Sequence, residues 1–209
     1  MHSKEVILIG NSGHALVIHE ILVQLGYKPI AYLAPKKIEN PLLQLEYWGS
    51  EENDQAVEKL HHISYFIAIG DNGIRERVFR NLIKKGIPDP ITIISTTAYV
   101  SPLAHIGSGS LIGTGSIIHP GTTIGRGCII NTGSIVDHDC QLGDFVHVAP
   151  GAVLCGNVFV KKGALIGAGS TIIPNIAIGK WATIGAGTVV IQDIKDNRAV
   201  VGNPARIIS

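Results

Sequence analysis

Aromatic side chains are scarce in this chain of 209 residues, where Phe, Tyr and Trp together make up 5% of the sequence. Charged residues are also few, at 16%, whereas glycine occurs 25 times. This composition is typical of a repeat built from small and aliphatic residues. The formal net charge of +1 provides no general attraction to nucleic acid or to an anionic membrane. We therefore expect neither of these partners.

Cysteine pairs and long apolar runs are missing as well. The three cysteines, Cys128, Cys140 and Cys155, form no CxxC pair, so we expect packing residues in a reducing compartment rather than a disulfide. The mean hydropathy is +0.31, but glycine and charge interrupt every apolar run. The N-terminal run MHSKEVILIG is too short for a signal peptide or a spanning helix. The expectation is a soluble cytoplasmic protein.

A six-residue period organises the second half of the chain. An Ile, Val or Leu occupies every sixth position from Val100 to Val190, which is 90 residues or 15 steps of six, and Gly commonly follows it. This hexapeptide repeat is typical of a parallel β-helix, in which three short strands make one triangular coil of about 18 residues. No hexad can bury its apolar side chain alone, so the coils must stack. An ordinary β-sandwich or barrel does not hold such a period.

The beginning of the chain alternates apolar strands with helices instead. Residues 5–10 (EVILIG) predict a buried strand, residues 15–25 a helix and residues 28–33 (KPIAYL) a second strand. This order opens a Rossmann-like unit, and the loop at residues 11–14 is placed to bind an anion or phosphate at the helix N-terminus.

That loop does not match a dinucleotide fingerprint. It lacks G-x-G-x-x-G, and no acidic residue stands directly after the second strand, where the sequence reads Leu33-Ala34-Pro35. A mononucleotide or a nucleotide sugar remains open.

The rest of the α/β part repeats the pattern. A short helix (55–61), a strand (65–70), an amphipathic helix (74–85) and a last strand (88–95) are predicted in that order. On the second helix we expect four basic side chains in solvent: Arg75, Arg77, Arg80 and Lys84. The loops at 10–14 and 70–73 should lie near each other, because the carboxyl ends of parallel strands share one edge of a sheet. We expect an α/β Rossmann-like domain over 1–97, an all-β domain over 98–192 and a tail over 193–209.

Charged residues are sparse in the repeat, which makes Asp137-His138-Asp139 and His147 its main candidate cluster. Strand alternation points His147 outward and places His138 at or near a corner of the coil. A histidine beside a carboxylate is suited to act as a general base, since the imidazole titrates near neutral pH and the carboxylate favours the imidazolium. A surface histidine next to a solvated aspartate is the alternative.

The sequence gives less support to a metal site or a covalent intermediate than to a histidine base. A zinc site shared between subunits needs two close histidines and a distant third, a pattern that His119, His138 and His147 do not form. We expect no metal. None of the three cysteines has an obvious base partner in the sequence, so an acyl-enzyme intermediate is not expected.

Several motifs resemble those of one family. Over essentially its whole length the chain resembles the bacterial sugar acetyltransferases of the PglD/NeuD type, which join a small Rossmann-like domain to a left-handed parallel β-helix. That family includes UDP-4-amino-sugar N-acetyltransferases and sialic acid O-acetyltransferases. The motifs are Gly10-Asn11-Ser12-Gly13-His14, Ile69-Gly70-Asp71-Asn72 with Arg75, Asn131-Thr132, Val136-Asp137-His138-Asp139-Cys140, Gly143-Asp144-Phe145-Val146-His147 and Val201-Gly202-Asn203-Pro204-Ala205.

The resemblance implies roles for the matching residues. It implies that His138 is the general base and that Asp139, where amino-sugar members often have Glu, orients it and raises its basicity. It implies contacts of acetyl-CoA with His147, Ala168 and Ala186. It implies contacts of the nucleotide sugar with Ser12, Gly13, His14, Gly70 and Asn131. The family is trimeric, so a homotrimer with active sites between subunits is implied.

The implied activity is transfer of acetyl from acetyl-CoA to the 4-amine of a UDP-4-amino-4,6-dideoxy sugar. Two alternatives are O-acetylation of sialic acid or a related sugar, and a non-catalytic β-helix that serves as a binding or assembly module. Ala34-Pro35 stands where UDP-sugar members carry acidic residues that hold uracil. This departure keeps a different nucleotide or a free sugar acid open.

Overall fold

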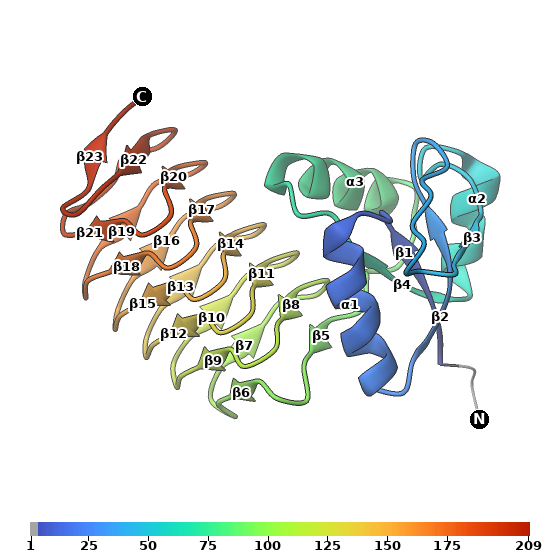
Figure 1. Cartoon of the computed structure of the whole chain (residues 1–209), viewed down its shortest axis with the longest axis horizontal. Coiled ribbons are helices and arrows are strands. Elements are labelled where there is room, and N and C mark those ends of the chain that lie inside the picture. Colours follow the sequence, from blue (N-terminus) through green and yellow to red (C-terminus); the bar gives the residue numbers. More distant parts are fainter. Residues whose placement is uncertain (1–3) are drawn as a thin grey trace.

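The computed structural model describes residues 4–209 and has two parts, an α/β part and a stack of triangular coils beside it (Figure 1). The α/β part contains one parallel sheet of four strands in the order β3-β2-β1-β4. Its strands are β1 (Glu5–Ile9), β2 (Lys28–Leu33), β3 (Glu46–Tyr47) and β4 (Ser64–Ile67). Its helices are α1 (Gly13–Gln24), α2 (Asp54–Glu58), η1 (Lys59–His61) and α3 (Asn72–Lys84).

Helices cover both faces of this sheet because the strands are apolar on both sides. On one face, Val6 and Leu8 pack with Ile18 and Leu22 of α1. On the other face, the remaining β1 side chains pack with residues of α2 and α3. The Rossmann-like arrangement predicted from the strand and helix pattern is confirmed.

The stack is a left-handed parallel β-helix with three sheets. The eight-stranded sheet consists of β5 (Ile93–Ile94), β8 (Leu111–Ile112), β11 (Ile129–Ile130), β14 (His147–Val148), β17 (Leu165–Ile166), β20 (Thr183–Ile184), β22 (Ala199–Val201) and β23 (Arg206–Ile207). The six-stranded sheet consists of β6 (Tyr99–Val100), β9 (Ile117–Ile118), β12 (Ile135–Val136), β15 (Val153–Leu154), β18 (Thr171–Ile172) and β21 (Val189–Val190). The five-stranded sheet consists of β7 (His105–Ile106), β10 (Thr123–Ile124), β13 (Gln141–Leu142), β16 (Phe159–Val160) and β19 (Ala177–Ile178).

The six-residue period produces this stack directly. Ile129 pairs with His147 and Ile135 with Val153, so one coil takes 18 residues. The repeated aliphatic residues fill the interior and are buried throughout, except Val100 and Ile106 at the open N-terminal end. Cys128 and Cys140 are fully buried in the same core, as expected for packing residues.

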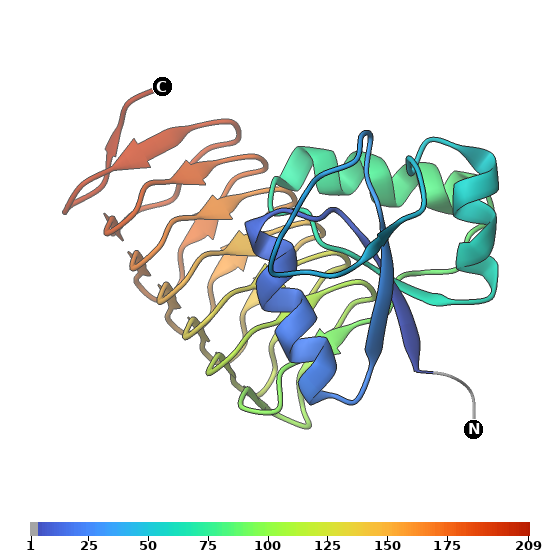
Figure 2. The ribbon, with the colours of Figure 1, turned by 45° about the vertical axis from the view of Figure 1, so that its right-hand side comes forward.

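The α/β part rests on the eight-stranded sheet. Outward-facing Leu111 and Ile129 are buried in the same cluster as helix α1, and Figure 2 shows this helix lying against the side of the stack. The two parts therefore share a core, which fixes the Rossmann-like sheet relative to one face of the coils.

Two segments differ from the sequence expectation. The strand expected over 88–95 shrinks to β5, which pairs with β8 in the β-helix and not with the four-stranded sheet. The segment 193–209 adds β22, in which Val200 pairs with Ile184, and the antiparallel strand β23. The last coil is therefore two residues shorter than the others, which hides it from a search for the six-residue period.

Candidate active site

His138 and Asp139 form a hydrogen-bonded pair at a corner of the coil. They occupy the turn between β12 and β13, and Nδ1 of His138 lies 2.9 Å from Oδ2 of Asp139. Asp139 has a left-handed backbone with φ of 58°, a conformation that aspartate adopts more readily than most residues. Both side chains are more than half exposed. The tight turn thus lets adjacent residues face each other at the surface.

The pair has the electrostatics of a general base. A carboxylate can only accept, so Nδ1 of His138 carries the proton and Nε2 has a free lone pair in the neutral form. The hydrogen bond to Asp139 raises the pKa of His138, and the charges of Asp137 and Asp139 act in the same direction. His138 is therefore a stronger base than a free histidine, with one nitrogen held and the other available.

Glycines leave room for this pair. Gly156 lies one coil beyond His138, and a Cβ built on it would lie 2.5 Å from both Cε1 and Nε2 of the imidazole. A Cβ on Gly121, one coil before, would collide with the Asp139 carboxylate. These two glycines were not identified from the sequence, since the repeat is rich in glycine and only contact with His138 or Asp139 distinguishes them.

His147 is held on a different surface of the same coil. It is the outward residue of β14, as strand alternation predicts, and it faces the α/β part. Asn131 donates to its Nε2 over 3.2 Å. Burial, with smaller contributions from Arg75 and His14, lowers the pKa of His147 to about 4. His147 is therefore neutral near pH 7, and its Nε2 accepts from Asn131.

The loop at the start of α1 carries three expected substrate residues. Ser12 is the N-cap residue of α1, its side chain makes no capping bond, and both Ser12 and Gly13 are exposed. Burial and the nearby charge of Arg75 lower the pKa of His14 to about 4. Its Nε2 is buried and has no hydrogen-bond partner among the described residues. The backbone N–H groups at this helix start and the neutral His14 are suited to hold a phosphate-bearing ligand.

A cavity of about 490 Å³ lies between the two parts of the molecule and is lined by residues of both. Gly70, Asp71 and His147 line it together with residues of the later coils, so the structure brings the expected Gly70 and His147 into one site. Asp71 caps helix α3 by accepting from the Ile74 N–H over 2.8 Å. One of its carboxylate oxygens is thus occupied by the fold.

Arg75 contradicts the expectation of a solvated side chain. It is 1% exposed and donates all five of its guanidinium N–H groups, two to carbonyl groups of the coils and three within the α/β part. The acceptors are the carbonyl oxygens of Gly127 (2.7 Å), Ile69 (3.0 Å), Gly70 (2.9 Å) and Phe145 (3.2 Å) and the side-chain oxygen of Asn72 (2.9 Å).

Asn72 extends this clamp, because its amide nitrogen donates to the carbonyl groups of Gly163 and Ala164. Helical spacing assigned Arg75 to the solvent side since α3 was considered alone. The coil that covers that side of α3 is distant in sequence. The only signal in the sequence was the presence of Asn72 and Arg75 in a motif shared with the family.

Ala168 and Ala186 lie in exposed turns that follow β17 and β20. They are one coil apart, and the Ala168 carbonyl accepts from the Gly187 N–H over 2.8 Å. Both belong to the corner between the eight-stranded and six-stranded sheets, next to the sheet that carries His147.

His138 is not brought to the other predicted residues within one chain. Its turn joins the six-stranded and five-stranded sheets, which is the corner opposite the eight-stranded sheet that carries His147 and the α/β part. Within one chain, His138 is thus separated from the predicted substrate loops by the width of the coil.

The described residues give little support to a cysteine nucleophile or a metal site. The three cysteines are free, and burial raises the pKa of Cys128 to about 12 and of Cys140 to about 11. Thiolate nucleophiles are therefore disfavoured. Among residues 4–209, no group of three or more His, Cys, Asp or Glu side chains is arranged around a metal position, and no helix is long and apolar enough to cross a bilayer.

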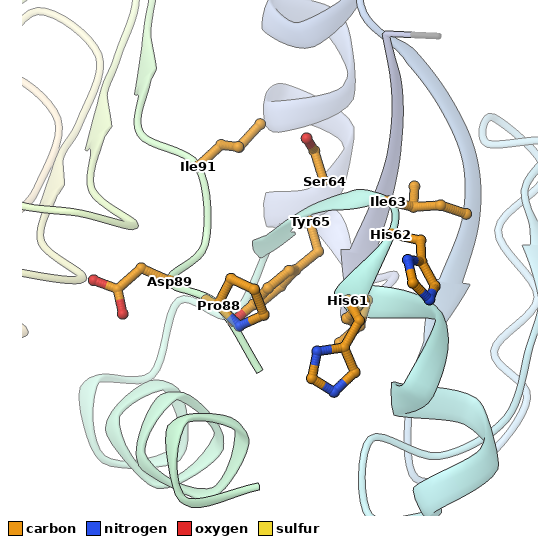
Figure 3. Close-up of a pocket in the computed structure, with 9 residues that line it drawn as sticks. His61, His62, Ile63, Ser64, Tyr65, Pro88, Asp89 and Ile91 are labelled. Carbon is orange, nitrogen blue, oxygen red and sulfur yellow. The ribbon is translucent and has the colours of Figure 1, made fainter. Parts of the chain in front are cut away.

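A second cavity, of about 200 Å³, lies at the amino end of β4 (Figure 3). His61, His62 and Ser64 line it, and the Tyr65 hydroxyl donates to the Pro88 carbonyl over 2.6 Å. Because ligands of such sheets bind at the carboxyl ends of the strands, this cavity lies at the wrong edge for the nucleotide.

Comparisons with known proteins agree with the two-part fold. The model of the PglD N-terminal domain matches residues 5–82, and that of the bacterial transferase hexapeptide (six repeats) matches residues 103–137, 121–156 and 157–192. No match to a curated protein sequence was found.

Solved structures match nearly the whole chain. The acetyltransferase domain of PglB from Neisseria gonorrhoeae, in complex with acetyl coenzyme A, is 32% identical, with a TM-score of 0.91 and coverage of 99% of this chain and 100% of that one. PerB from Caulobacter crescentus, in complex with CoA and GDP-perosamine, is 35% identical, with a TM-score of 0.89 and coverage of 98% and 97%. WeeI from Acinetobacter baumannii is 27% identical, with a TM-score of 0.80 and coverage of 97% and 99%. The chain therefore belongs to the bacterial hexapeptide sugar acetyltransferases with a PglD-type N-terminal domain.

Proposed function

We propose that the protein transfers acetyl from acetyl-CoA to the amine of a nucleotide-linked amino sugar. The observation that carries this proposal is the His138–Asp139 pair, which presents a basic Nε2 at the surface of the β-helix. Two relatives over the full chain support the substrates, since one was solved with acetyl-CoA and the other with CoA and GDP-perosamine. The UDP-4-amino-4,6-dideoxy sugar expected from the sequence belongs to the same chemical class.

The reaction needs one proton acceptor. Nε2 of His138 takes a proton from the sugar amine as its nitrogen attacks the thioester carbonyl carbon, so a C–N bond forms and the C–S bond breaks. The departing CoA thiolate then receives the proton from the imidazolium. Asp139 holds the ring and stabilises the imidazolium during this exchange. No acyl-enzyme is required, because both substrates meet in one site.

His147 is the less suitable base. Its pKa of about 4 makes it a weak acceptor, and Asn131 already donates to its Nε2. We assign it a positioning role near the thioester, with Asn131 fixing the ring. In this proposal the exposed His138 gains a proton during the reaction, and the buried His147 stays neutral.

The corner that carries Ala168 and Ala186 fits the extended arm of acetyl-CoA. Glycines recur along this corner at 18-residue intervals, and a Cβ built on any of them meets no atom within 4 Å; they are Gly115, Gly133, Gly151, Gly169 and Gly187. The corner is thus smooth and open along its length. An elongated ligand beside it reaches the backbone of Ala168 and Ala186 without displacing side chains.

We further propose a homotrimer with active sites between subunits. Because His138 lies on the corner opposite the α/β part, it reaches a bound nucleotide sugar only in a neighbouring copy. Mixed assemblies test this: His138→Ala chains combined with chains altered at Gly70 should regain activity that neither variant has alone. Mixtures without such recovery would contradict the shared site. The cytoplasmic location stays a prediction.

An acetyl-transfer assay tests the function. Purified protein is given acetyl-CoA with UDP-linked or GDP-linked 4-amino sugars, CMP-sialic acid or free sialic acid, and thiol release is followed. We expect release with an amino sugar, a product amide stable to mild base, and loss of release in His138→Ala. The matched control is His61→Ala, at an exposed histidine far from the corner. A base-labile ester formed only from a sialic acid would replace the proposal with O-acetylation.

A further inference from the structure

A cavity of about 370 Å³ lies at the carboxyl end of β2, next to the loop that carries Ser12 and Gly13. Six residues that matter for its chemistry line it: Asn11, Tyr32, Lys37, Ile38, Glu39 and Asn40. Its volume falls in the range of about 300–1,000 Å³ found for small-molecule sites. In open α/β sheets this edge receives the ligand.

The loop that forms the cavity wall is fixed by hydrogen bonds. The Tyr32 hydroxyl donates to the Ile38 carbonyl (2.9 Å) and accepts from the Ile38 N–H (3.0 Å), and the Asn11 amide donates to the same carbonyl (3.1 Å). Asn40 in turn donates to the Asn11 carbonyl over 3.3 Å. Lys37 and Glu39 flank the fixed Ile38, so both chain positions are held beside the cavity.

The cavity contains polar groups that the fold leaves available. Neither Lys37 nor Glu39 forms a salt bridge within residues 4–209, and both are exposed. Asn11 is only 2% exposed, and its Oδ1 has no hydrogen-bond partner in the described structure. The Ile38 carbonyl can only accept, which requires the amide nitrogen of Asn11 to face it and leaves this oxygen over. The site thus offers one cationic donor, one carboxylate and one spare acceptor.

We propose that this cavity binds the guanine base of the nucleotide sugar, with the Glu39 carboxylate accepting from N1–H and the 2-amino group and Lys37 donating to O6. This assignment rests on the proposed function and names its nucleotide. Among the common bases only guanine presents two adjacent N–H donors beside an acceptor on one edge. Two parallel hydrogen bonds to a carboxylate are strong and directional.

The other bases match this set less well. Uracil presents one N–H between two carbonyl oxygens, so a carboxylate facing that N–H also meets an acceptor. Cytosine and adenine each present one amino group beside an acceptor nitrogen. Glu39 also supplies an acidic side chain where Ala34-Pro35 provides none, because the bonds to Ile38 hold the following residue near the end of β2.

Isothermal titration of the full chain with GDP, IDP and UDP tests the assignment. IDP lacks only the 2-amino group of guanine. We expect GDP to bind about 10- to 100-fold more tightly than UDP and about 10-fold more tightly than IDP, as hydrogen bonds to a charged group imply. Glu39→Ala should bring the GDP-to-IDP ratio close to one. Glu58→Ala, at an exposed residue of α2 outside the cavity, should keep the wild-type ratio.

Two results would overturn the assignment: UDP binding at least as tightly as GDP, or a GDP-to-IDP ratio that survives Glu39→Ala. Failure of the proposed function is distinguishable, because nucleotide binding is measured without acetyl transfer. Guanine-selective binding without transfer to any amino sugar would refute the acetyltransferase proposal and leave the base assignment in place. Transfer to UDP-linked amino sugars with no GDP preference would do the reverse.

Discussion

Replacing Gly156 with alanine is expected to disable the enzyme through a single methyl group. The imidazole of His138 lies against Gly156, and the new Cβ would lie 2.5 Å from its Cε1 and Nε2. Gly156 does not have a positive φ, so alanine introduces no backbone strain at this position. The perturbation acts on the ring and not on the coil.

The size of the effect follows from the contact distance. Carbon atoms in contact sit about 3.5–4.0 Å apart, so the ring must move by about 1 Å or more. Such a displacement swings Nε2 away from its position and strains the hydrogen bond to Asp139. A misplacement of about 1 Å in a catalytic group typically costs about 10²-fold in rate. We expect kcat of Gly156→Ala to fall by about that factor.

The assay is steady-state thiol release as a function of pH, with acetyl-CoA and the accepted amino sugar. The KM for acetyl-CoA should change little, and the apparent pKa of the rate should fall toward that of free histidine as the Asp139 bond weakens. Pro174→Ala is the matched control, because Pro174 occupies the same turn position one coil beyond Gly156 and is exposed. A Gly156→Ala enzyme with wild-type kcat and an unchanged pH profile would refute the positioning of His138 by this glycine.

Three further predictions concern the titratable groups and the clamp. Because Asp139 raises the pKa of His138 and the neutral imidazole is the active base, kcat/KM should rise with pH through that raised pKa. Asp139→Asn should move this rise to lower pH and lower the plateau of kcat/KM. A pH profile that does not move would contradict the role of Asp139. Arg75→Met should lower the free energy of unfolding by about 3 kcal/mol or more, because it removes five hydrogen bonds, of which the two to Gly127 and Phe145 are buried. Urea unfolding measures this, and a change below about 1 kcal/mol would show that the clamp is dispensable. His14 and His147 have pKa values of about 4 in the folded chain against 6.5 when unfolded, so the unfolded chain binds more protons between these pH values. The free energy of unfolding should be highest above pH 6.5 and fall by about 3 kcal/mol per histidine as the pH drops toward 4. In urea titrations at several pH values, His147→Asn should reduce this loss.

The β-helix could be predicted from the sequence because its period is a local property. An aliphatic residue recurs every six positions along the chain, and each one packs on its equivalent in the next coil. Val200 escaped the pattern because the last coil is two residues shorter, although it is buried and paired like the others.

The α/β part was predicted in type, and its errors come from contacts that are distant in sequence. Helical spacing placed Arg75 in solvent, but its partners Gly127 and Phe145 lie 52 and 70 residues away on the coils. The strand expected over 88–95 joined the other part for the same reason. No periodicity within a helix or strand reveals which distant surface will cover it.

The candidate site was predictable as a set of residues and not as an arrangement. The His138–Asp139 pair was identified because charged residues are sparse in the repeat, and their contact follows from adjacency in a tight turn. Gly156 and Glu39 were not identified. Gly156 contacts His138 only because successive coils stack. Glu39 reaches its cavity only because Tyr32 holds the loop at Ile38 by a hydrogen bond.

The most direct test of the central claim compares His138→Ala with the wild-type enzyme in acetyl transfer to the accepted amino sugar. If His138 takes the proton from the amine, kcat should fall by about 10²–10⁴-fold. The KM for acetyl-CoA should stay within a few-fold of the wild-type value, and added imidazole should restore part of the rate. A variant that transfers acetyl at the wild-type rate would contradict the assignment of His138 as the general base.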